Sequence, residues 1–222
     1  MISDQTTYRV YGLTQAFGEA KAGKPKPEDV PCEETLFVKL SPKPEKGLIA
    51  IAAPWDALPR KPKVMDTTQK VYVDAVGDFL KTKGIEQPKV KIENILRVDL
   101  DGDGEDEVLI SATNYFSNDS PVPMRSPAAS YSMVVVRRVV AGKVEAQLVE
   151  GEFYPTAYPT PSENDANFNA PNAYKVIGMF DLDGDGKLEI VVHSQYYEGE
   201  MTTIYECDPK KAEAMLSVGC GA

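Results

Sequence analysis

Residues 99–104 read Asp-Leu-Asp-Gly-Asp-Gly, and residues 181–186 repeat the same six letters. Three residues later each segment has a glutamate, Glu107 or Glu189, which opens a strand-like apolar run. Aspartates at the first, third and fifth positions of a tight loop direct three carboxylates at one centre, where their repulsion is costly without a cation. The glycines between them permit the left-handed or crowded backbone that such a loop needs. Because hard oxygen ligands in a flexible loop suit calcium, we predict two calcium (Ca²⁺) sites.

Each predicted site combines four carboxylates with one backbone carbonyl. The first ion is expected to be held by the carbonyl of Glu105 and by the side chains of Asp99, Asp101, Asp103 and Glu107. The second ion is expected to be held by the carbonyl of Lys187 and by the side chains of Asp181, Asp183, Asp185 and Glu189. The glutamate at the ninth position of each loop therefore closes the predicted coordination shell.

Two other kinds of loop share part of this pattern. An acidic, glycine-rich turn needs no metal, but two copies in matching context favour metal binding over that alternative. An EF-hand has the same opening, but it requires a bidentate glutamate at the twelfth position and a helix on each side. The twelfth positions here are Ile110 and Val192, and the flanking segments are β-rich. The chain is therefore not predicted to act as a calmodulin-like switch.

The similarity between the two halves extends beyond the loops. Identical residues recur at an offset of 82 around each loop, as in Ile95 and Ile177. Farther along the chain, similar residues recur at an offset of 68, as in Met133 and Met201, so the first copy carries 14 extra residues. This surplus lies around residues 114–130, which are rich in Ser, Pro and Asn. A unit repeated at this period is typical of propeller blades or of a repeat array.

Each unit reads as four strands, rich in the Val, Ile, Tyr and Thr residues that favour a pleated, half-buried surface. In the first unit we expect strands at residues 90–98, 107–113, 131–140 and 143–150. In the second unit we expect them at residues 174–180, 189–195, 202–207 and 212–218. Since the metal loop joins the first two strands of each unit, calcium would fix their register.

From about residue 90 to residue 220 the chain resembles the FG-GAP and VCBS-like repeats of integrin alpha subunits and of many bacterial extracellular proteins. The resemblance rests on residues 99–107 and 181–189 and on the strand that follows each loop. It implies that each repeat is a four-stranded antiparallel propeller blade with calcium between its first two strands. Two such units are visible, and a closed propeller needs more blades than two.

The first part of the chain has a different pattern. Residues 34–40 and 47–53 are expected to form a strand pair, and residues 18–31 are expected to be irregular because they are rich in Pro, Lys and Gly. Asp66 is a good N-cap for a helix over residues 67–83, where apolar residues recur at helical spacing. Gly84 follows at the position where a helix commonly ends.

The predicted fold is therefore mainly β, with two four-stranded antiparallel, propeller-blade-like repeats, an N-terminal strand pair and one helix. The predicted divisions are an N-terminal region packed on the repeats, the first repeat, a linker and the second repeat, at residues 1–88, 89–153, 154–172 and 173–222.

Composition limits the partners that this chain is expected to have. The formal net charge of −10 argues against binding to nucleic acid or to an anionic membrane. Hydrophobic residues make up 42% of the chain, and no apolar run approaches membrane-spanning length, so no membrane insertion is expected. We expect a monomer whose loops meet a protein or glycan partner.

The three cysteines leave the redox state open. Cys207 aligns with the apolar Val139 of the first repeat and is expected to be a buried thiol. If a disulfide forms, Cys32 before the first clear strand and Cys220 after the last are the favoured pair. Calcium is abundant outside the cytosol, so we expect an extracellular, periplasmic or cell-envelope location, although no export signal is visible at Met1.

Support for catalysis is small. His193 is the only histidine, and no nucleophile motif surrounds it, so a structural or surface role is favoured over a general base. The predicted function is therefore a non-enzymatic, calcium-stabilised interaction module. Just beyond the strands that leave the metal loops lie the aromatic residues Tyr115, Phe116, Tyr196 and Tyr197, which would form either a contact patch for the partner or part of the core. The alternative is a secreted, calcium-dependent hydrolase that acts on an extracellular polymer. A concave pocket with titratable groups that are not metal ligands would favour the hydrolase.

Overall fold

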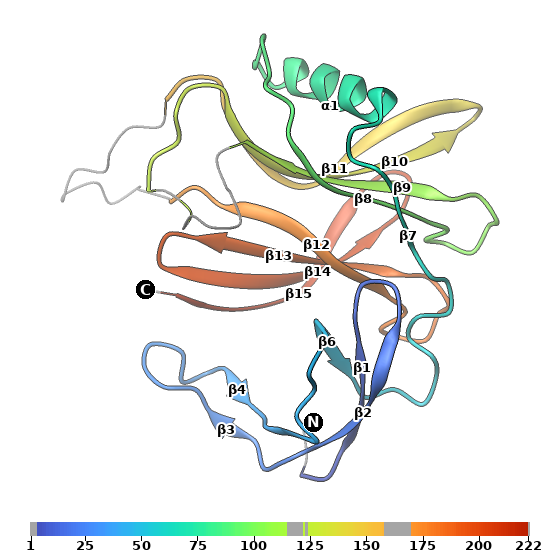
Figure 1. The fold of residues 1–222 in the computed structure, drawn as a ribbon, viewed down its shortest axis with the longest axis vertical. Helices are drawn as coiled ribbons and strands as arrows, with labels where there is room; N and C mark the ends of the chain where they lie inside the picture. The colour runs from blue at the N-terminus through green and yellow to red at the C-terminus, as the bar shows by residue number, and fades with distance from the viewer. Residues whose placement is uncertain (1–3, 115–121, 123, 158–169, 222) are drawn as a thin grey trace.

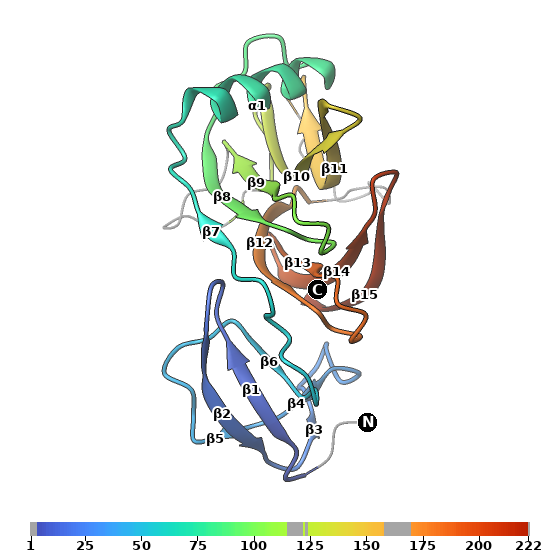
Figure 2. The ribbon, with the colours of Figure 1, turned by 90° about the vertical axis from the view of Figure 1, so that its right-hand side faces the viewer.

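The computed structural model describes residues 4–114, 122, 124–157 and 170–221. The molecule consists of stacked layers (Figure 1 and Figure 2): a helix, a sheet from the first repeat, a sheet from the second repeat and an N-terminal sheet. The prediction of a mainly β fold with antiparallel four-stranded units is confirmed, and the described strands do not close into a barrel.

The sheets of the two repeats are antiparallel meanders, each with an acidic loop between its first two strands. The first sheet contains β8 (Ile92–Val98), β9 (Glu107–Thr113), β10 (Ser130–Val140) and β11 (Lys143–Tyr154). The second contains β12 (Ala173–Phe180), β13 (Glu189–Tyr196), β14 (Gly199–Cys207) and β15 (Ala212–Gly221). The first sheet also gains a fifth strand, β7 (Lys63–Val64), at the edge beside β8. This two-residue strand is too short to produce a sequence periodicity.

The two repeat sheets stack front to back. Leu109 faces the second sheet, whereas its repeat equivalent, Val191, faces the N-terminal layer. Ile110 faces the helix, whereas its equivalent, Val192, faces the first sheet. Equivalent faces therefore point the same way along the stack, and each repeat buries one face against a different neighbour. The helix covers the free face of the first sheet, and the N-terminal layer covers the free face of the second.

The N-terminal sheet differs from the predicted strand pair. Its strands are β1 (Thr7–Tyr11), β2 (Ala16–Ala22), β5 (Leu40–Ser41) and β6 (Ile49–Ile51), in the order β5-β2-β1-β6. The pairing predicted between residues 34–40 and 47–53 is wrong, because β6 pairs with β1 and β5 pairs with β2. Pairing beside β1 places Ile49 and Ile51 next to Tyr11 in the core formed with Phe180 of the second repeat.

Residues 18–31 are also more regular than predicted. They contribute most of β2 and the short strand β3 (Lys26–Pro27), which pairs with β4 (Leu36–Phe37). The pattern of β2 is hard to recognise because only Ala20 and Ala22 of this strand are buried. The strand is held by its pairing with β1 and β5 and not by a large apolar face.

One helix, α1 (Lys70–Thr82), forms within the predicted range, but it begins later than expected. Its N-cap residue is Gln69, while the Asp66 carboxylate accepts a hydrogen bond from the Thr68 backbone at 2.8 Å. The predicted end is confirmed. Gly84 adopts φ +84°, and the Ile85 N–H donates to the Leu80 carbonyl at 3.1 Å, which is the pattern of a Schellman motif.

A disulfide joins Cys32 to Cys220, with 5.5 Å between their Cα atoms, and confirms the favoured pair. It ties the N-terminal region to the last strand of the second repeat. Cys207 is a free thiol that is half-buried against the core between the two repeat sheets. Within the described residues, no helix has the length and hydrophobicity needed to span a membrane.

Some predicted features lie outside the described residues. These are most of the linker, much of the surplus segment of the first repeat, and the aromatic residues Tyr115 and Phe116. Tyr197 is described, and its side chain is 48% exposed.

Candidate functional site: two adjacent acidic loops

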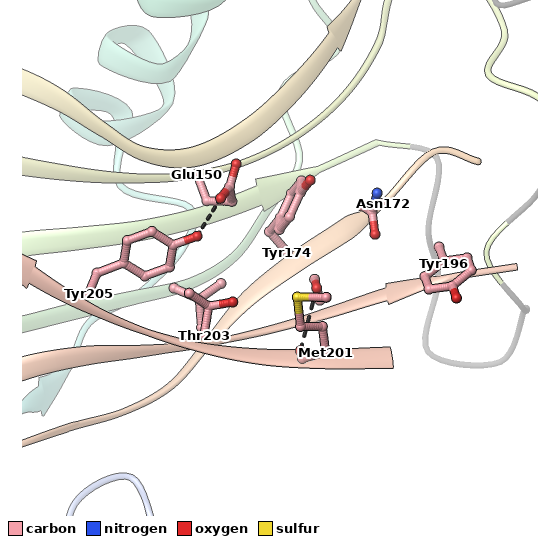
Figure 3. A pocket seen from close by; sticks show the side chains of 9 residues that line it. Glu150, Asn172, Tyr174, Tyr196, Met201, Thr203 and Tyr205 are labelled. Carbon is pink, nitrogen blue, oxygen red and sulfur yellow. Dashed lines mark hydrogen bonds between the residues drawn. The ribbon is translucent and has the colours of Figure 1, made fainter. Parts of the chain in front are cut away.

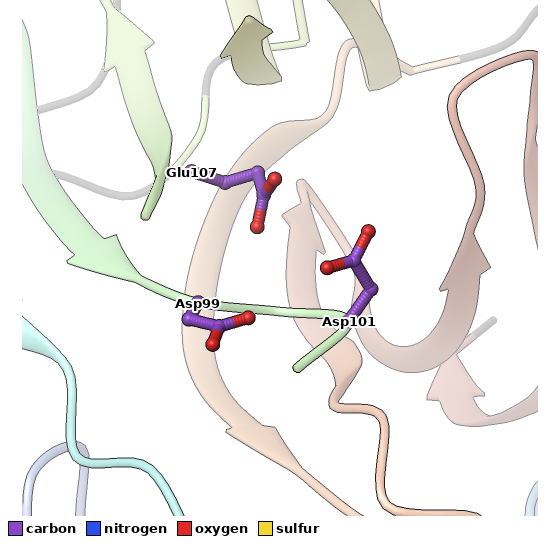
Figure 4. Close-up of side chains that lie close together, drawn as sticks. All are labelled: Asp99, Asp101 and Glu107. Carbon is purple, nitrogen blue, oxygen red and sulfur yellow. The ribbon is translucent and has the colours of Figure 1, made fainter. Parts of the chain in front are cut away.

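Each acidic loop brings three of its predicted ligands together. In the first loop, carboxylate oxygens of Asp99, Asp101 and Glu107 all lie within 4.8 Å of one another (Figure 4). The aspartates leave the end of β8, and Glu107 reaches back from the start of β9. Since β8 and β9 are hydrogen-bonded neighbours, the strand pairing holds the two ends of the loop in place.

The second loop repeats this arrangement. Carboxylate oxygens of Asp181, Asp183 and Glu189 also lie within 4.8 Å of one another. Both Asp181 and Glu189 are buried, at 5% and 7% exposure. The repeat in the sequence is thus reproduced as a repeat of geometry.

Backbone amides fix the orientation of these carboxylates. Asp99 accepts hydrogen bonds from the N–H groups of Gly102 at 2.6 Å and Gly104 at 3.1 Å. Glu107 accepts one from the N–H of Leu100 at 2.8 Å. Each loop is therefore wrapped around its own acidic side chains.

The second loop has matching bonds. Asp181 accepts from the N–H of Gly184 at 2.7 Å, and Glu189 accepts from the N–H of Leu182 at 2.7 Å. These glycines lie at positive φ in both loops, a conformation that a side chain would strain.

The remaining predicted ligands lie at the rim. The Asp103 carboxylate accepts from the N–H of Glu105 at 2.8 Å, and the Asp185 carboxylate accepts from the N–H of Lys187 at 2.7 Å. Neither aspartate belongs to the three-residue clusters. Ligation by these two side chains and by the carbonyls of Glu105 and Lys187 stays a prediction.

Burial makes these carboxylates costly to ionise. The pKa of Glu189 is raised to about 7, chiefly because burial disfavours its charged form and secondarily because Asp183 and Asp185 repel it. The pKa of Glu107 is also raised, chiefly by burial, with Asp101 adding to the rise. A bound divalent cation would reverse both effects by supplying the opposite charge at the centre of each cluster.

The two loops touch each other through Arg60. Its guanidinium donates to the carbonyls of Asp99 at 2.6 Å and Leu100 at 3.0 Å in the first loop, and to that of Gly186 at 2.7 Å in the second. The N–H of Leu188 also donates directly to the Leu100 carbonyl at 2.8 Å. Arg60 comes from the connection between the N-terminal sheet and α1, so a third segment joins the two loops.

The same connection supports the second loop from its other side. The Trp55 indole N–H donates to the Asp181 carbonyl at 2.9 Å, and the Asp181 N–H donates to the Ala57 carbonyl at 2.9 Å. The pattern of residues did not predict Trp55 or Arg60 as parts of this site. The only signals were that Trp55 is the single tryptophan and that Arg60 lies in a proline-rich, aperiodic stretch.

The loops differ in the charge opposite the closing glutamate. Register between β9 and β10 pairs Val108 with Arg137, so Arg138 lies opposite Glu107. Arg138 is only 7% exposed, and its Nε and Nη2 atoms have no hydrogen-bond partner within the described residues. In the second repeat the corresponding position, opposite Glu189, is the exposed Glu206. A buried cation therefore lies near the first cluster, and an anion lies opposite the closing residue of the second.

The donor set fits a hard cation. Each cluster offers carboxylate oxygens and no sulfur or imidazole ligand, which suits calcium better than zinc or copper. When bound, a calcium ion would supply two positive charges to each loop. Asp99, Asp101 and Glu107 would hold the first ion, and Asp181, Asp183 and Glu189 would hold the second.

Comparison with models of protein families, with curated proteins and with solved structures gives no significant match. The resemblance to FG-GAP and VCBS-like repeats therefore stays a prediction, and the conclusions below rest on the residues of this chain.

Proposed function

We propose that this protein is a calcium-stabilised, non-enzymatic interaction module. The observation that carries the proposal is the pair of matching three-carboxylate clusters, each placed where a loop joins two adjacent strands. Without metal, each cluster crowds like charges into a partly buried space. Binding of calcium relieves that repulsion, so part of the free energy of binding becomes free energy of folding.

The position of the clusters supports a structural role for the metal. The two loops lie side by side and share contacts with Arg60, at the junction of the two repeat sheets and the N-terminal connection. Fixing both loops would therefore fix the relative placement of these parts. The surfaces formed by the other loops would then be presented to a partner in one arrangement.

An oxidising, calcium-rich compartment suits these features. The Cys32–Cys220 disulfide is typical of proteins outside the reducing cytosol. Extracellular modules bind calcium with dissociation constants of about 0.1–1 mM, a range that cytosolic calcium does not reach. We therefore place the protein in the cell envelope, the periplasm or the extracellular space.

Calorimetry on chelator-treated protein tests the proposal. We expect two calcium ions to bind, and thermal denaturation to show a higher Tm with calcium than with chelator. At a calcium concentration a hundredfold above the dissociation constant, the stabilisation is about 2.7 kcal/mol per site. Asp183→Ala should remove much of the response, whereas Glu198→Gln, which changes an exposed carboxylate beyond the loops, should leave it unchanged. Absence of binding at millimolar calcium would reject the proposal.

A further inference from the structure

A cavity of about 190 Å³ lies between the second repeat sheet and the last strand of the first (Figure 3). None of the predicted metal ligands lines it, although it extends along β13 from Val192, three residues after Glu189, to Tyr196 at the end of the strand. Side chains from four strands converge on it. The residues that carry its chemistry are Glu150, Tyr174, Tyr196, Met201, Thr203 and Tyr205.

Tyrosine hydroxyls at this cavity are committed to carboxylates. The Tyr205 hydroxyl donates to Glu150, which lies on the facing sheet. The hydroxyl of Tyr174, which lines the cavity, donates to Glu152 at 3.0 Å. Glu152 lies outside the lining and also accepts from the Tyr154 hydroxyl at 2.7 Å, so it adds negative charge next to the cavity and not in it. A phenol that donates its proton to a carboxylate presents a more electron-rich ring. The cavity thus combines negative charge with aromatic surface. Glu150 is the only carboxylate among the described residues of its lining, so the lining lacks the pair of carboxylates that glycoside hydrolysis needs, and the pocket does not by itself favour the hydrolase.

No basic group of the described chain neutralises this charge. The lining of the cavity contains no Lys, Arg or His. Among the ion pairs of the described residues, none involves Glu150 or Glu152. Glu150 and Glu152, which are two positions apart on β11, therefore have hydrogen-bond partners but no ion-pair partner among the described residues.

These features favour a positively charged ligand over a neutral sugar. An ammonium group gains from both the aromatic faces and the carboxylates, and such contacts strengthen when they are shielded from water. A sugar would gain from free hydroxyl donors, but the hydroxyls of Tyr174 and Tyr205 already donate to the glutamates. The cavity is also small, below the usual range of about 300–1,000 Å³ for drug-sized ligands. A single alkylammonium group matches this size.

We propose that this cavity binds an alkylammonium group, supplied by a lysine side chain of a protein partner or by a free organic ammonium compound. The proposal names the chemistry of the partner for the interaction module. It stands on Glu150, Glu152 and the surrounding tyrosines, so it does not depend on calcium binding at the acidic loops.

Nuclear magnetic resonance titration of the full chain tests the inference, with the methyl group of Met201 as the reporter inside the cavity. The probes are n-butylammonium and its uncharged counterpart n-butanol, at constant ionic strength. We expect a saturable shift with butylammonium, with a dissociation constant on the order of 1 mM, and no saturable shift with butanol. Equal binding of the two probes, or binding of neither, would overturn the proposal.

Matched variants locate the binding. Glu150→Gln keeps an acceptor for the Tyr205 hydroxyl but removes the charge, and it should weaken butylammonium binding at least about fivefold. Glu145→Gln, an exposed position on the same strand, should leave binding unchanged. If Glu150→Gln lowers the Tm, the titration is repeated with Glu152→Gln, which is also expected to weaken butylammonium binding. Equal affinities for Glu145→Gln and both cavity variants would refute the site.

Two further probes identify the source of the ammonium group. Tighter binding of Nα-acetyl-lysine methylamide than of choline would indicate a lysine of a protein partner, and the reverse order would indicate a free quaternary ammonium compound. Calcium calorimetry on the same samples separates this result from the proposed metal role, because ammonium binding is expected whether or not the loops bind calcium.

Discussion

Arg60 is predicted to couple the two acidic loops, so that calcium in one loop raises the affinity of the other. A single guanidinium donates to carbonyls of both loops at 2.6–3.0 Å, and its planar fork matches three acceptors at once. An ion that orders one loop would therefore fix the Arg60 side chain and reduce the cost of ordering the second loop.

The magnitude follows from the contacts that would be lost. In Arg60→Ala the Leu100 carbonyl keeps the Leu188 N–H as a donor, whereas the carbonyls of Asp99 and Gly186 lose the guanidinium. Leaving a carbonyl unpaired costs about 1–3 kcal/mol when it is buried. Because the Arg60 side chain is 25% exposed, water replaces part of this loss. We expect a total of about 2–4 kcal/mol in the free energy of unfolding.

Calcium calorimetry on site-directed variants measures the coupling itself. Asp101→Asn disables the first loop, and the affinity of the second loop is then compared with that in the unaltered protein. We expect a fall of about 5–150-fold, the usual range for coupled sites. In an Arg60→Lys background, where the charge remains but the fork is lost, Asp101→Asn should have little effect on the second loop. Arg9→Lys, an arginine in exposed ion pairs, is the matched control.

Two results would refute this reasoning. One is a second-loop affinity that does not respond to Asp101→Asn in the unaltered protein. The other is coupling that persists in full when Arg60 is replaced by lysine. Either result would mean that the two loops bind calcium independently, in spite of their shared contacts.

Three more predictions follow from charge and covalent structure. Arg138 is a buried cation opposite the closing glutamate of the first loop, so its charge should weaken calcium binding there. Calorimetry of Arg138→Gln should therefore show about tenfold tighter calcium binding at the first site, or about 1.4 kcal/mol, and weaker binding there would contradict the argument. The matched Glu206→Gln should weaken calcium binding at the second site. Cys32→Ser removes the disulfide between Cys32 and Cys220, which are 188 positions apart. The free energy of unfolding, measured by urea denaturation, should fall by about 4–5 kcal/mol because the unfolded chain gains conformational freedom. An unchanged denaturation midpoint would show that the disulfide does not restrict the unfolded chain. Burial raises the pKa of the Cys207 thiol to about 12, so this thiol stays protonated in the folded protein below that pH. A thiol reagent should therefore label Cys207 slowly at pH 8 until denaturant exposes it. Rapid labelling of the folded protein would contradict this prediction.

Local patterns in the sequence were sufficient for much of the fold. The spacing of aspartates and glycines located both loops, and the apolar runs rich in Val, Ile, Tyr and Thr located the strands of both repeats. The end of the helix was also predictable, because Gly84 supplies the left-handed residue that a Schellman motif needs. These features depend on contacts between residues close in the chain, so the residues themselves contain the information.

The choice of partners was decided only in the tertiary structure. The short strand β6 pairs with β1 and not with the segment before it, because this places Ile49 and Ile51 against the core shared with Phe180. No local pattern encodes such a long-range preference. The front-to-back stacking of the repeat sheets has the same origin, since each face finds its cover in another part of the chain.

The candidate sites divide along the same line. The sequence by itself determined which acidic residues meet in each loop, because these residues lie within nine positions of one another. It did not determine that the loops are neighbours, that Arg60 joins them, or that Glu150 meets Tyr205 at a cavity between two sheets. Glu150 and Tyr205 are 55 positions apart, and Arg60 and Gly186 are 126 positions apart, so only the packing of whole layers brings them together.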